Sequence, residues 1–210
     1  MGLVLGGCRG AVSSQEPALI FLASASPRRR SLLRQHRVAH RVLYPRYKEK
    51  MIAGVGPSKL TRMHAIGKAK SLVSKIQDGV ILAADTVVWR SGKVLGKPGT
   101  MREAVSMLRF LSGNWHRVVT GVALLRVRAG RVAGKKVFTV TSRVHIKPMT
   151  DAQIKSYFKK VHPLDKAGAY AIQSPRISIV DRVVGSASNV AGLPMEELLG
   201  HLKAAIFKIR

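Results

Sequence analysis

The residues whose types and spacing most clearly suit a chemical role form a turn that could bind an anion. Residues 19–23 are apolar and predict a buried strand, and Ser26, Pro27, Arg28 and Arg29 follow as the start of a helix. A helix N-terminus presents unpaired N–H groups and a partial positive charge, and arginine adds forked donors, so this turn could hold a phosphate. Because charge runs usually lie on solvated faces, the pattern alone leaves a plain basic surface open as an alternative.

Two acidic residues stand out in a chain that has few of them. Asp85 lies in residues 80–89, a run that is apolar except for Asp85 and Thr86 and therefore predicts an interior strand. A carboxylate buried there must be paired, hydrogen-bonded or bound to a metal, so Asp85 is either a site residue or a structural hydrogen-bonding group. Glu49 is isolated from other acids, and pairing with a basic neighbour on the surface is its simpler interpretation.

Two lysines lie where the predicted structure would restrict them. Lys68 falls near the apolar stripe of a helix predicted over residues 58–76, so it either extends to water or reaches a neighbouring cleft. Lys97 is flanked by Gly96 and Pro98, which fix the backbone and could present its ammonium group at a defined point. An ordinary turn lysine is an equally common explanation. The local pattern leaves both alternatives open for each lysine.

The whole chain is strongly basic. Its 210 residues include 37 Lys and Arg but only 10 Asp and Glu, for a formal net charge of +27. Such a charge attracts nucleotides, nucleic acid and anionic membranes in a salt-dependent way. The basic residues are spread along the chain and only 5% of residues are aromatic, so a general compositional drift explains the charge as well as a dedicated nucleic-acid surface does.

Length and composition indicate a globular protein of one domain or two small lobes, with 46% hydrophobic residues. Cys8 is the only cysteine, which excludes an intrachain disulfide and a cysteine-based metal site and fits a reducing compartment. Residues 1–17 predict a flexible N-terminal extension without the features of a signal peptide, and residues 18–210 predict the folded domain. No segment reaches membrane-spanning length, so we expect a cytoplasmic protein.

Apolar periodicity and turn residues predict the remaining elements. Thr100 and Glu103 predict a capping box at the start of a helix over residues 101–111, and Ser58 predicts the cap of the preceding helix. The other expected elements are a strand at 38–44, a loop at 46–58, a hairpin turn at 90–93, strands at 117–128 and 135–147 joined by a loop at 129–134, a helix at 150–160, a strand at 177–184, a loop at 185–194 and a helix at 195–209.

Taken together, these motifs resemble the Maf family of nucleoside triphosphate pyrophosphatases, which is related in fold to the inosine triphosphatases. The resemblance spans residue 19 to the C-terminus. Its motifs are Leu22 to Arg29, Lys68-Ala69, Ala84-Asp85-Thr86-Val87, Gly96-Lys97-Pro98, Leu111-Ser112-Gly113 with His116, Thr120-Gly121, Asp165 to Tyr170 with Gln173, and Asn189-Val190 with Gly192-Leu193-Pro194. The family's fold would be α/β, a mixed twisted sheet flanked by helices, with two lobes and a central nucleotide-binding cleft.

The resemblance also implies roles for single residues. It assigns the triphosphate to Ser26, Arg28, Arg29, Lys68 and Lys97, the catalytic and metal-binding carboxylates to Glu49 and Asp85, and a pyrimidine edge to Gln173. The expected cofactor is a divalent metal, Mg²⁺ or Mn²⁺, and the expected products are a nucleoside monophosphate and pyrophosphate. Asp165 and Lys166 either support the cleft or form a structural ion pair. The motifs resemble the subgroup that acts on dTTP and UTP, with modified pyrimidine nucleotides as further candidates, more than the one acting on 7-methyl-GTP.

The chain departs from the family pattern at its acidic site. Where the family usually has consecutive acids, this sequence has Lys48-Glu49, so one candidate metal ligand is absent. The alternative interpretation is therefore a catalytically impaired protein of the same fold that binds nucleotides or nucleic acid. For partners, we expect a nucleoside triphosphate substrate, no membrane, non-specific attraction to nucleic acid, and a homodimer, since relatives in the family are often dimers.

Overall fold

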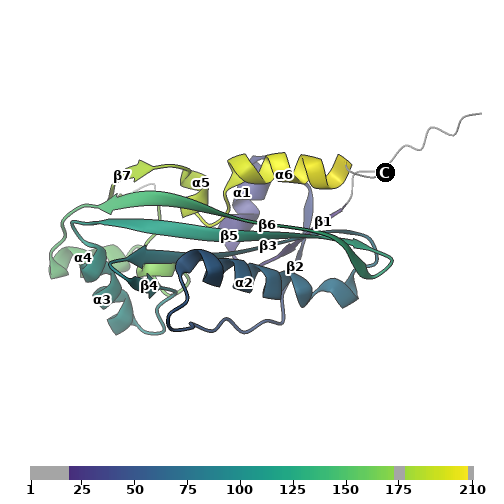
Figure 1. The fold of residues 1–210 in the computed structure, drawn as a ribbon. Coiled ribbons are helices and arrows are strands. Elements are labelled where there is room, and N and C mark those ends of the chain that lie inside the picture. The colour runs from purple at the N-terminus through teal and green to yellow at the C-terminus, as the bar shows by residue number, and fades with distance from the viewer. Residues whose placement is uncertain (1–18, 173–177, 208–210) are drawn as a thin grey trace, which may run out of the picture.

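A mixed β-sheet forms the centre of the molecule in the computed structural model, which describes residues 19–172 and 178–207. Its strands in these ranges are β1 (Ile20–Ala23), β2 (His40–Leu43), β3 (Gly79–Arg90), β4 (Lys93–Leu95), β5 (Trp115–Arg128), β6 (Arg131–Ile146) and β7 (Val180–Val184). They are ordered β2-β1-β3-β5-β6-β7, with β4 also paired to β3. β1 runs parallel to β2 and β3, whereas β3–β4, β3–β5, β5–β6 and β6–β7 are antiparallel (Figure 1). The expectation of an α/β fold with a mixed sheet is confirmed.

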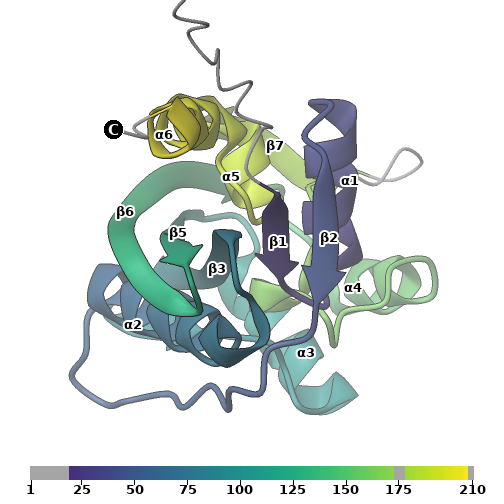
Figure 2. The same cartoon turned by 90° about the vertical axis from the view of Figure 1, so that its right-hand side faces the viewer.

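Helices flank this sheet on both faces. They are α1 (Pro27–Gln35), α2 (Pro57–Lys70), α3 (Met101–Leu111), α4 (Asp151–Phe158), α5 (Ala187–Val190) and α6 (Met195–Phe207), with short 3₁₀ helices η1 (Val73–Lys75) and η2 (Ala167–Ala169). Figure 2 shows α6 above the strands and α2 below them. Among the described residues, no helix combines the length and apolar character that crossing a bilayer requires.

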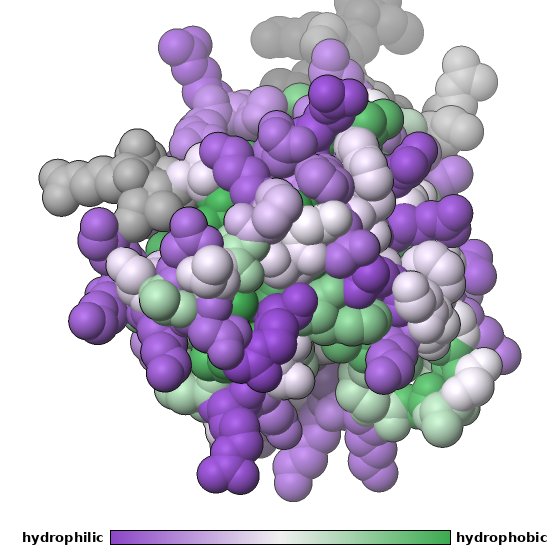
Figure 3. Space-filling view, turned by 90° about the vertical axis from the view of Figure 1, so that its left-hand side faces the viewer, coloured by the Kyte–Doolittle hydropathy of each residue, from purple (hydrophilic) through white to green (hydrophobic). Residues whose placement is uncertain are grey.

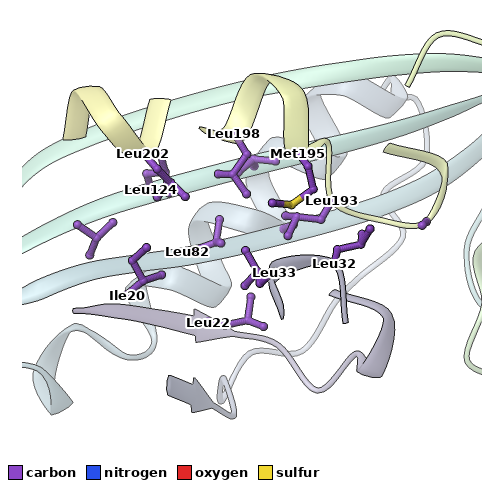
Figure 4. Packing of buried hydrophobic residues seen from close by; sticks show 14 residues of the cluster. Ile20, Leu22, Leu32, Leu33, Leu82, Leu124, Leu193, Met195, Leu198 and Leu202 are labelled. Atoms are coloured by element: carbon purple, nitrogen blue, oxygen red, sulfur yellow. The ribbon is translucent and has the colours of Figure 1, made fainter. Parts of the chain in front are cut away.

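The interior strand β3 is buried on both faces, as its sequence predicts. Val80, Leu82 and Ala84 join a hydrophobic cluster with residues of α1 and α6 (Figure 4). Ile81 and Ala83 point to the other face and belong to the cluster formed with α2. Because side chains alternate along a strand, a run that is apolar at every position can satisfy both layers of helices.

The same strand links two parts of the core. Near its end β3 contributes Val88 to a separate cluster that contains Leu108 of α3 and Ile154 of α4. The polar residues Asp85 and Thr86 lie between the β3 segments that serve the two clusters. The polar pair therefore occurs where β3 passes from one cluster to the other.

Several predicted boundaries are wrong in detail. The helix expected to be capped by Ser58 begins at Pro57, with Gly56 at the cap position, because proline at the first helical position is compatible with its missing N–H. That helix ends at Lys70 and is followed by η1. The loop expected at 185–194 contains α5, and β6 begins at Arg131, so the hairpin loop is much shorter than predicted.

The capping box expected at α3 is only half formed. Thr100 Oγ1 accepts a hydrogen bond from the N–H of Glu103, but the Glu103 carboxylate accepts from Gly99 N at 2.6 Å and not from Thr100. A complete capping box occurs at α4, between Thr150 and Gln153. The N–H of Gly99, the residue before the cap, lies within reach of the Glu103 carboxylate, which therefore bonds Gly99 instead of Thr100.

The surface is largely hydrophilic (Figure 3), in agreement with the high net charge of the chain. Figure 3 shows hydrophilic residues distributed over the whole of one end of the molecule, with hydrophobic patches between them. The chain has 37 Lys and Arg against only 10 Asp and Glu. The basic character is therefore a property of the surface in general and does not by itself locate a site.

Candidate functional site

A cleft with a volume of about 610 Å³ gathers most of the residues that the sequence singles out. This size is within the range of about 300–1,000 Å³ typical of small-molecule sites. Seven predicted site residues line it: Ser26, Arg28, Arg29, Glu49, Lys68, Asp85 and Lys97. They come from α1, α2, β3 and the two loops that carry Glu49 and Lys97. Gln173, the eighth, lies outside the described residues.

The first wall of the cleft is the turn between β1 and α1. Ser26 occupies the N-cap position and Pro27 the first helical position, as predicted. The Ser26 hydroxyl makes no capping hydrogen bond, whereas its backbone N–H donates to Ser24 Oγ at 3.2 Å. The hydroxyl and the positive end of α1 therefore face the cleft as candidate donors to an anion.

Arg29 is fixed by the protein before any ligand arrives. Its Nε donates to the carbonyl of Gly192 at 2.8 Å, Nη1 to Ser24 Oγ at 3.2 Å and Nη2 to Thr86 Oγ1 at 3.1 Å. Burial lowers the pKa of Arg29, and the nearby carboxylates of Asp85 and Glu49 oppose that effect. A guanidinium held at three points gives the floor of the cleft a cation of fixed orientation.

Arg28 is held by an ion pair at the edge of the cleft. Its Nη1 donates to Asp165 Oδ2 at 2.7 Å and its Nη2 to the Asp165 carbonyl at 3.0 Å. Lys166 Nζ donates to the other carboxylate oxygen at 2.6 Å, so the Asp165–Lys166 ion pair exists and includes Arg28 as well. Partial burial would raise the pKa of Asp165, but the hydrogen bonds from Lys166 and Arg28 lower it to about 2.

The opposite wall is a lysine bound by two carboxylates. Lys68 Nζ lies 2.6 Å from Asp85 Oδ1 and 2.6 Å from Glu49 Oε1, and 3.3 Å from the carbonyl of Ala84. Lys68 and Asp85 are only 6% and 4% exposed. Lys68 thus reaches the cleft and not the solvent, and Glu49 pairs with it and not with its basic neighbours on the loop, so the simpler surface interpretation of Glu49 is wrong.

Glu49 is the more accessible of the two acids, with 40% of its side chain exposed. Partial burial would raise the pKa of Glu49, but Lys68, and then Lys97 and Arg29, lower it below its usual value. The carboxylate is therefore ionised at neutral pH. It can accept a proton or a hydrogen bond from water in the cleft, which Asp85 is less exposed to do.

Close packing of α2 on the sheet places Lys68 beside Asp85. Asp85 pairs in register with Gly121 on β5. A Cβ at Gly121 would lie 2.5 Å from the carbonyl carbon of Thr61, so only glycine allows the helix backbone to approach this closely. The absence of a side chain on β5 thus lets an ammonium group from α2 reach a carboxylate inside the sheet.

Lys97 supplies an accessible cation. It lies in the exposed loop after β4, where the carbonyl of Gly96 accepts a hydrogen bond from Gly168 N at 3.0 Å. In residues 19–172 and 178–207 no carboxylate forms an ion pair with Lys97, in contrast to Arg28 and Lys68. An incoming anion would therefore meet this ammonium group without displacing a protein partner.

The acidic pair fits a divalent metal that arrives with a phosphate ligand. Among the described residues no cluster of three or more His, Cys, Asp or Glu occurs. Glu49 and Asp85 each use one oxygen for Lys68 and keep a second, and magnesium is commonly bound by one or two carboxylates together with substrate phosphates and water. These hard oxygen ligands suit Mg²⁺ or Mn²⁺ and would not suit a metal that requires cysteine.

Two further residues that line the cleft, Tyr47 and His64, are not among the predicted site residues. The Tyr47 hydroxyl lies 3.0 Å from His64 Nδ1, and the ring lies against Gly67. The signal in the sequence was Gly67 itself, because a glycine in the interior of a helix often has a packing reason.

Comparisons with known proteins agree with this geometry. A family model described as Maf-like protein matches residues 19–205. A protein of Carboxydothermus hydrogenoformans named dTTP/UTP pyrophosphatase is 42% identical over 184 residues, which cover 88% of this chain and 97% of that protein. Proteins with the same name from Gloeobacter violaceus and Halalkalibacterium halodurans are 42% and 40% identical, covering 86% and 91% of this chain and 92% and 98% of theirs.

A likeness to solved structures is weaker. The structure of the Staphylococcus aureus Ham1 protein covers 61% of this chain and 71% of that chain at 14% identity, with a TM-score of 0.38. A score this low adds nothing to the assignment, which rests on the sequence relatives and the family model.

Proposed function

Since the chain belongs to the Maf family, we propose that it is a nucleoside triphosphate pyrophosphatase that hydrolyses dTTP and UTP to the monophosphate and pyrophosphate. The observation that carries this proposal is the meeting of two phosphate-compatible arginines, two lysines and two carboxylates around one cleft. The choice of dTTP and UTP follows the names of the relatives. Modified pyrimidine nucleotides with the same base edge are further candidates.

The cations would bind the triphosphate. Arg29 is already oriented, Lys97 has no carboxylate partner among the described residues, and the N-terminus of α1 adds backbone donors. Arg28 would have to share its guanidinium between Asp165 and the ligand. Together these groups balance a polyanion and hold the α- and β-phosphates in a fixed position for attack by water.

Glu49 would orient the attacking water. It is ionised and partly exposed, and it pairs with Lys68, the same ammonium group that pairs with Asp85. Asp85 is buried and fixes Lys68, which leaves the accessible carboxylate to receive the proton that water loses on attacking the phosphorus. A bound Mg²⁺ or Mn²⁺, held by Glu49 and Asp85, would supply Lewis-acid polarisation of the phosphoryl oxygens.

Two observations favour the alternative of a catalytically impaired binding protein. Lys68 already neutralises part of the charge of both carboxylates, and the residue before Glu49 is the basic Lys48. Both features would weaken metal binding. In that case nucleotides would still bind to the arginines and Lys97, and turnover would be lost.

The test is pyrophosphate release from a panel of nucleoside triphosphates with Mg²⁺ or Mn²⁺. We expect release from dTTP and UTP by the unaltered protein and a loss of about 10²-fold or more in Asp85→Asn and Glu49→Gln. Nucleotide binding without release from any triphosphate would favour the impaired alternative. Gel filtration tests the expected homodimer, and the salt dependence of RNA binding tests the non-specific attraction.

A further inference from the structure

The acidic residue proposed to orient water lies on a long connection with few contacts of its own. Thirteen residues separate β2, which ends at Leu43, from α2, which begins at Pro57. Much of this connection is exposed, including Met51 at 58% and Ile52 at 42%. Because fixing a backbone has an entropy cost at every residue, something must hold this loop if the Glu49 carboxylate is to stay at one place in the cleft.

In the described part of the chain, two side chains form the hydrogen bonds and ion pairs that join residues 44–55 to α2. One is Glu49 itself, through Lys68. The other is Tyr47, whose hydroxyl lies 3.0 Å from Nδ1 of His64. His64 is 3% exposed, and its ring meets that of Tyr47 edge-on, with centroids 5.7 Å apart and an interplanar angle of 61°.

The ring of Tyr47 also packs against α2, at Gly67. A Cβ built on Gly67 would lie 2.2 Å from Cε2 and 2.5 Å from Cζ of Tyr47, so any side chain at Gly67 would displace the ring. His64 and Gly67 are three residues apart and share one face of α2. Lys68, whose ammonium group Glu49 contacts, lies four residues after His64 on the same side of α2, and Tyr47, His64 and Lys68 all line the cleft.

The chemistry of the contact supports a lasting hydrogen bond. The Tyr47 hydroxyl can either donate to or accept from Nδ1 of His64, and a buried polar atom such as this ring nitrogen needs a partner. The other ring nitrogen of His64, Nε2, is buried and has no partner among the described residues. Tyr47 therefore provides the one hydrogen bond that this buried histidine ring makes there.

We propose that Tyr47, which packs against Gly67 and is hydrogen-bonded to His64, is a positioning residue that holds Glu49 in the cleft. The two side chains are two residues apart, so both reach α2 while Lys48 between them is exposed. Because Tyr47 fixes the loop against α2, less conformational entropy is lost when Glu49 forms its ion pair with Lys68. This inference rests on the proposed function, since it gives Glu49 the water-orienting role.

The kinetic test compares full-length Tyr47→Ala, Tyr47→Phe and Gly67→Ala with Ile52→Ala, a control on the same loop outside the cleft. We expect kcat for dTTP to fall about 10- to 100-fold in Tyr47→Ala and Gly67→Ala, with KM changed far less, because the cationic groups that bind phosphate are untouched. Tyr47→Phe keeps the ring on Gly67 and should recover part of the loss. Ile52→Ala should match the unaltered protein.

A double variant separates positioning from a direct role. If Tyr47 acts only through Glu49, then Tyr47→Ala combined with Glu49→Gln should be no slower than Glu49→Gln alone. Multiplied losses in the double variant, or an unchanged kcat in Tyr47→Ala, would overturn the proposal.

Limited proteolysis gives a readout that does not depend on turnover. Trypsin should cleave after Lys48 and Lys50, both exposed on this loop, about tenfold faster or more in Tyr47→Ala than in Ile52→Ala, because cleavage requires the loop to leave its place on α2. Equal cleavage rates in both variants would contradict the proposal that Tyr47 holds the loop. If the unaltered protein hydrolyses no triphosphate, the proposed function fails, and this comparison alone decides whether Tyr47 holds the loop. If Tyr47→Ala does not fold, Tyr47→Phe and Gly67→Ala carry the same comparison.

Discussion

Replacing Lys68 by methionine would remove the ammonium group that pairs with both Glu49 and Asp85. Methionine keeps most of the length and apolar character of the side chain, so the helix face stays packed. Asp85 would then remain buried, at 4% exposure, without its ammonium partner. Glu49, with 40% of its side chain exposed, could turn toward water and lose little.

The size of the effect follows from that asymmetry. Breaking a buried ion pair by removing one partner costs about 3–5 kcal/mol, because the other charge stays uncompensated. Only one of the two acids is fully buried here, so we expect the lower end, a loss of about 3 kcal/mol in the free energy of unfolding. With an m value of about 2 kcal/mol/M, the urea midpoint would fall by about 1.5 M.

The assay is urea unfolding at neutral pH, with Lys70→Met as the matched control. Lys70 is exposed on the same helix and has no ion pair among the described residues, so its replacement should change stability by less than about 0.5 kcal/mol. A second arm adds Mg²⁺, which should stabilise Lys68→Met more than the unaltered protein, because a cation could then occupy the place of the ammonium group. Equal midpoints for Lys68→Met and Lys70→Met would refute the reasoning.

Three further changes test other contacts. Gly121→Ala should destabilise the protein by about 1–3 kcal/mol and lower activity, because the new methyl group would push α2 from β5; thermal unfolding without a shift would contradict this. Burial lowers the pKa of His116 to about 4, so the free energy of unfolding should fall by up to about 3 kcal/mol as the pH drops from about 6.5 to 4. His116→Gln can still form a hydrogen bond with Tyr170, and its urea unfolding should lack this pH dependence; an equal dependence in the variant would contradict the prediction. Partial burial would raise the pKa of Asp165, but hydrogen bonds from Lys166 and Arg28 lower it to about 2. The stabilisation by Asp165 should therefore be present above about pH 4 and lost toward pH 2, and because Asp165 is half exposed we expect less than about 1 kcal/mol. Asp165→Asn should lower the thermal unfolding midpoint slightly at pH 7 and not at pH 2, and a difference that grows as the pH falls would contradict this.

The parts of this fold that could be read from the sequence are those set by local chemistry. Residues 80–89 are apolar at nearly every position, and the strand they form is buried on both faces. Pro27 after a serine predicts a helix start that the structure has. Asp85 was a site candidate for a physical reason, since a carboxylate inside such a strand needs a partner.

The partners themselves could not be read, because they depend on distances between elements. Lys68 reaches Asp85 only because Gly121, on another strand, lets α2 approach. Glu49 looked like a surface acid because its neighbours in sequence are basic, yet its partner is on α2. The role of Tyr47 depends in the same way on Gly67, twenty residues later in the chain.

The central claim is that the two carboxylates around Lys68 convert a phosphate-binding cleft into a hydrolase site. The most direct measurement is pyrophosphate and monophosphate release from dTTP by the unaltered protein, Asp85→Asn and Glu49→Gln under the same concentration of Mg²⁺. We expect equal amounts of the two products from the unaltered protein, and a loss of about 10²-fold or more in each variant. Undiminished release by both variants, or orthophosphate as the product in place of pyrophosphate, would contradict the claim.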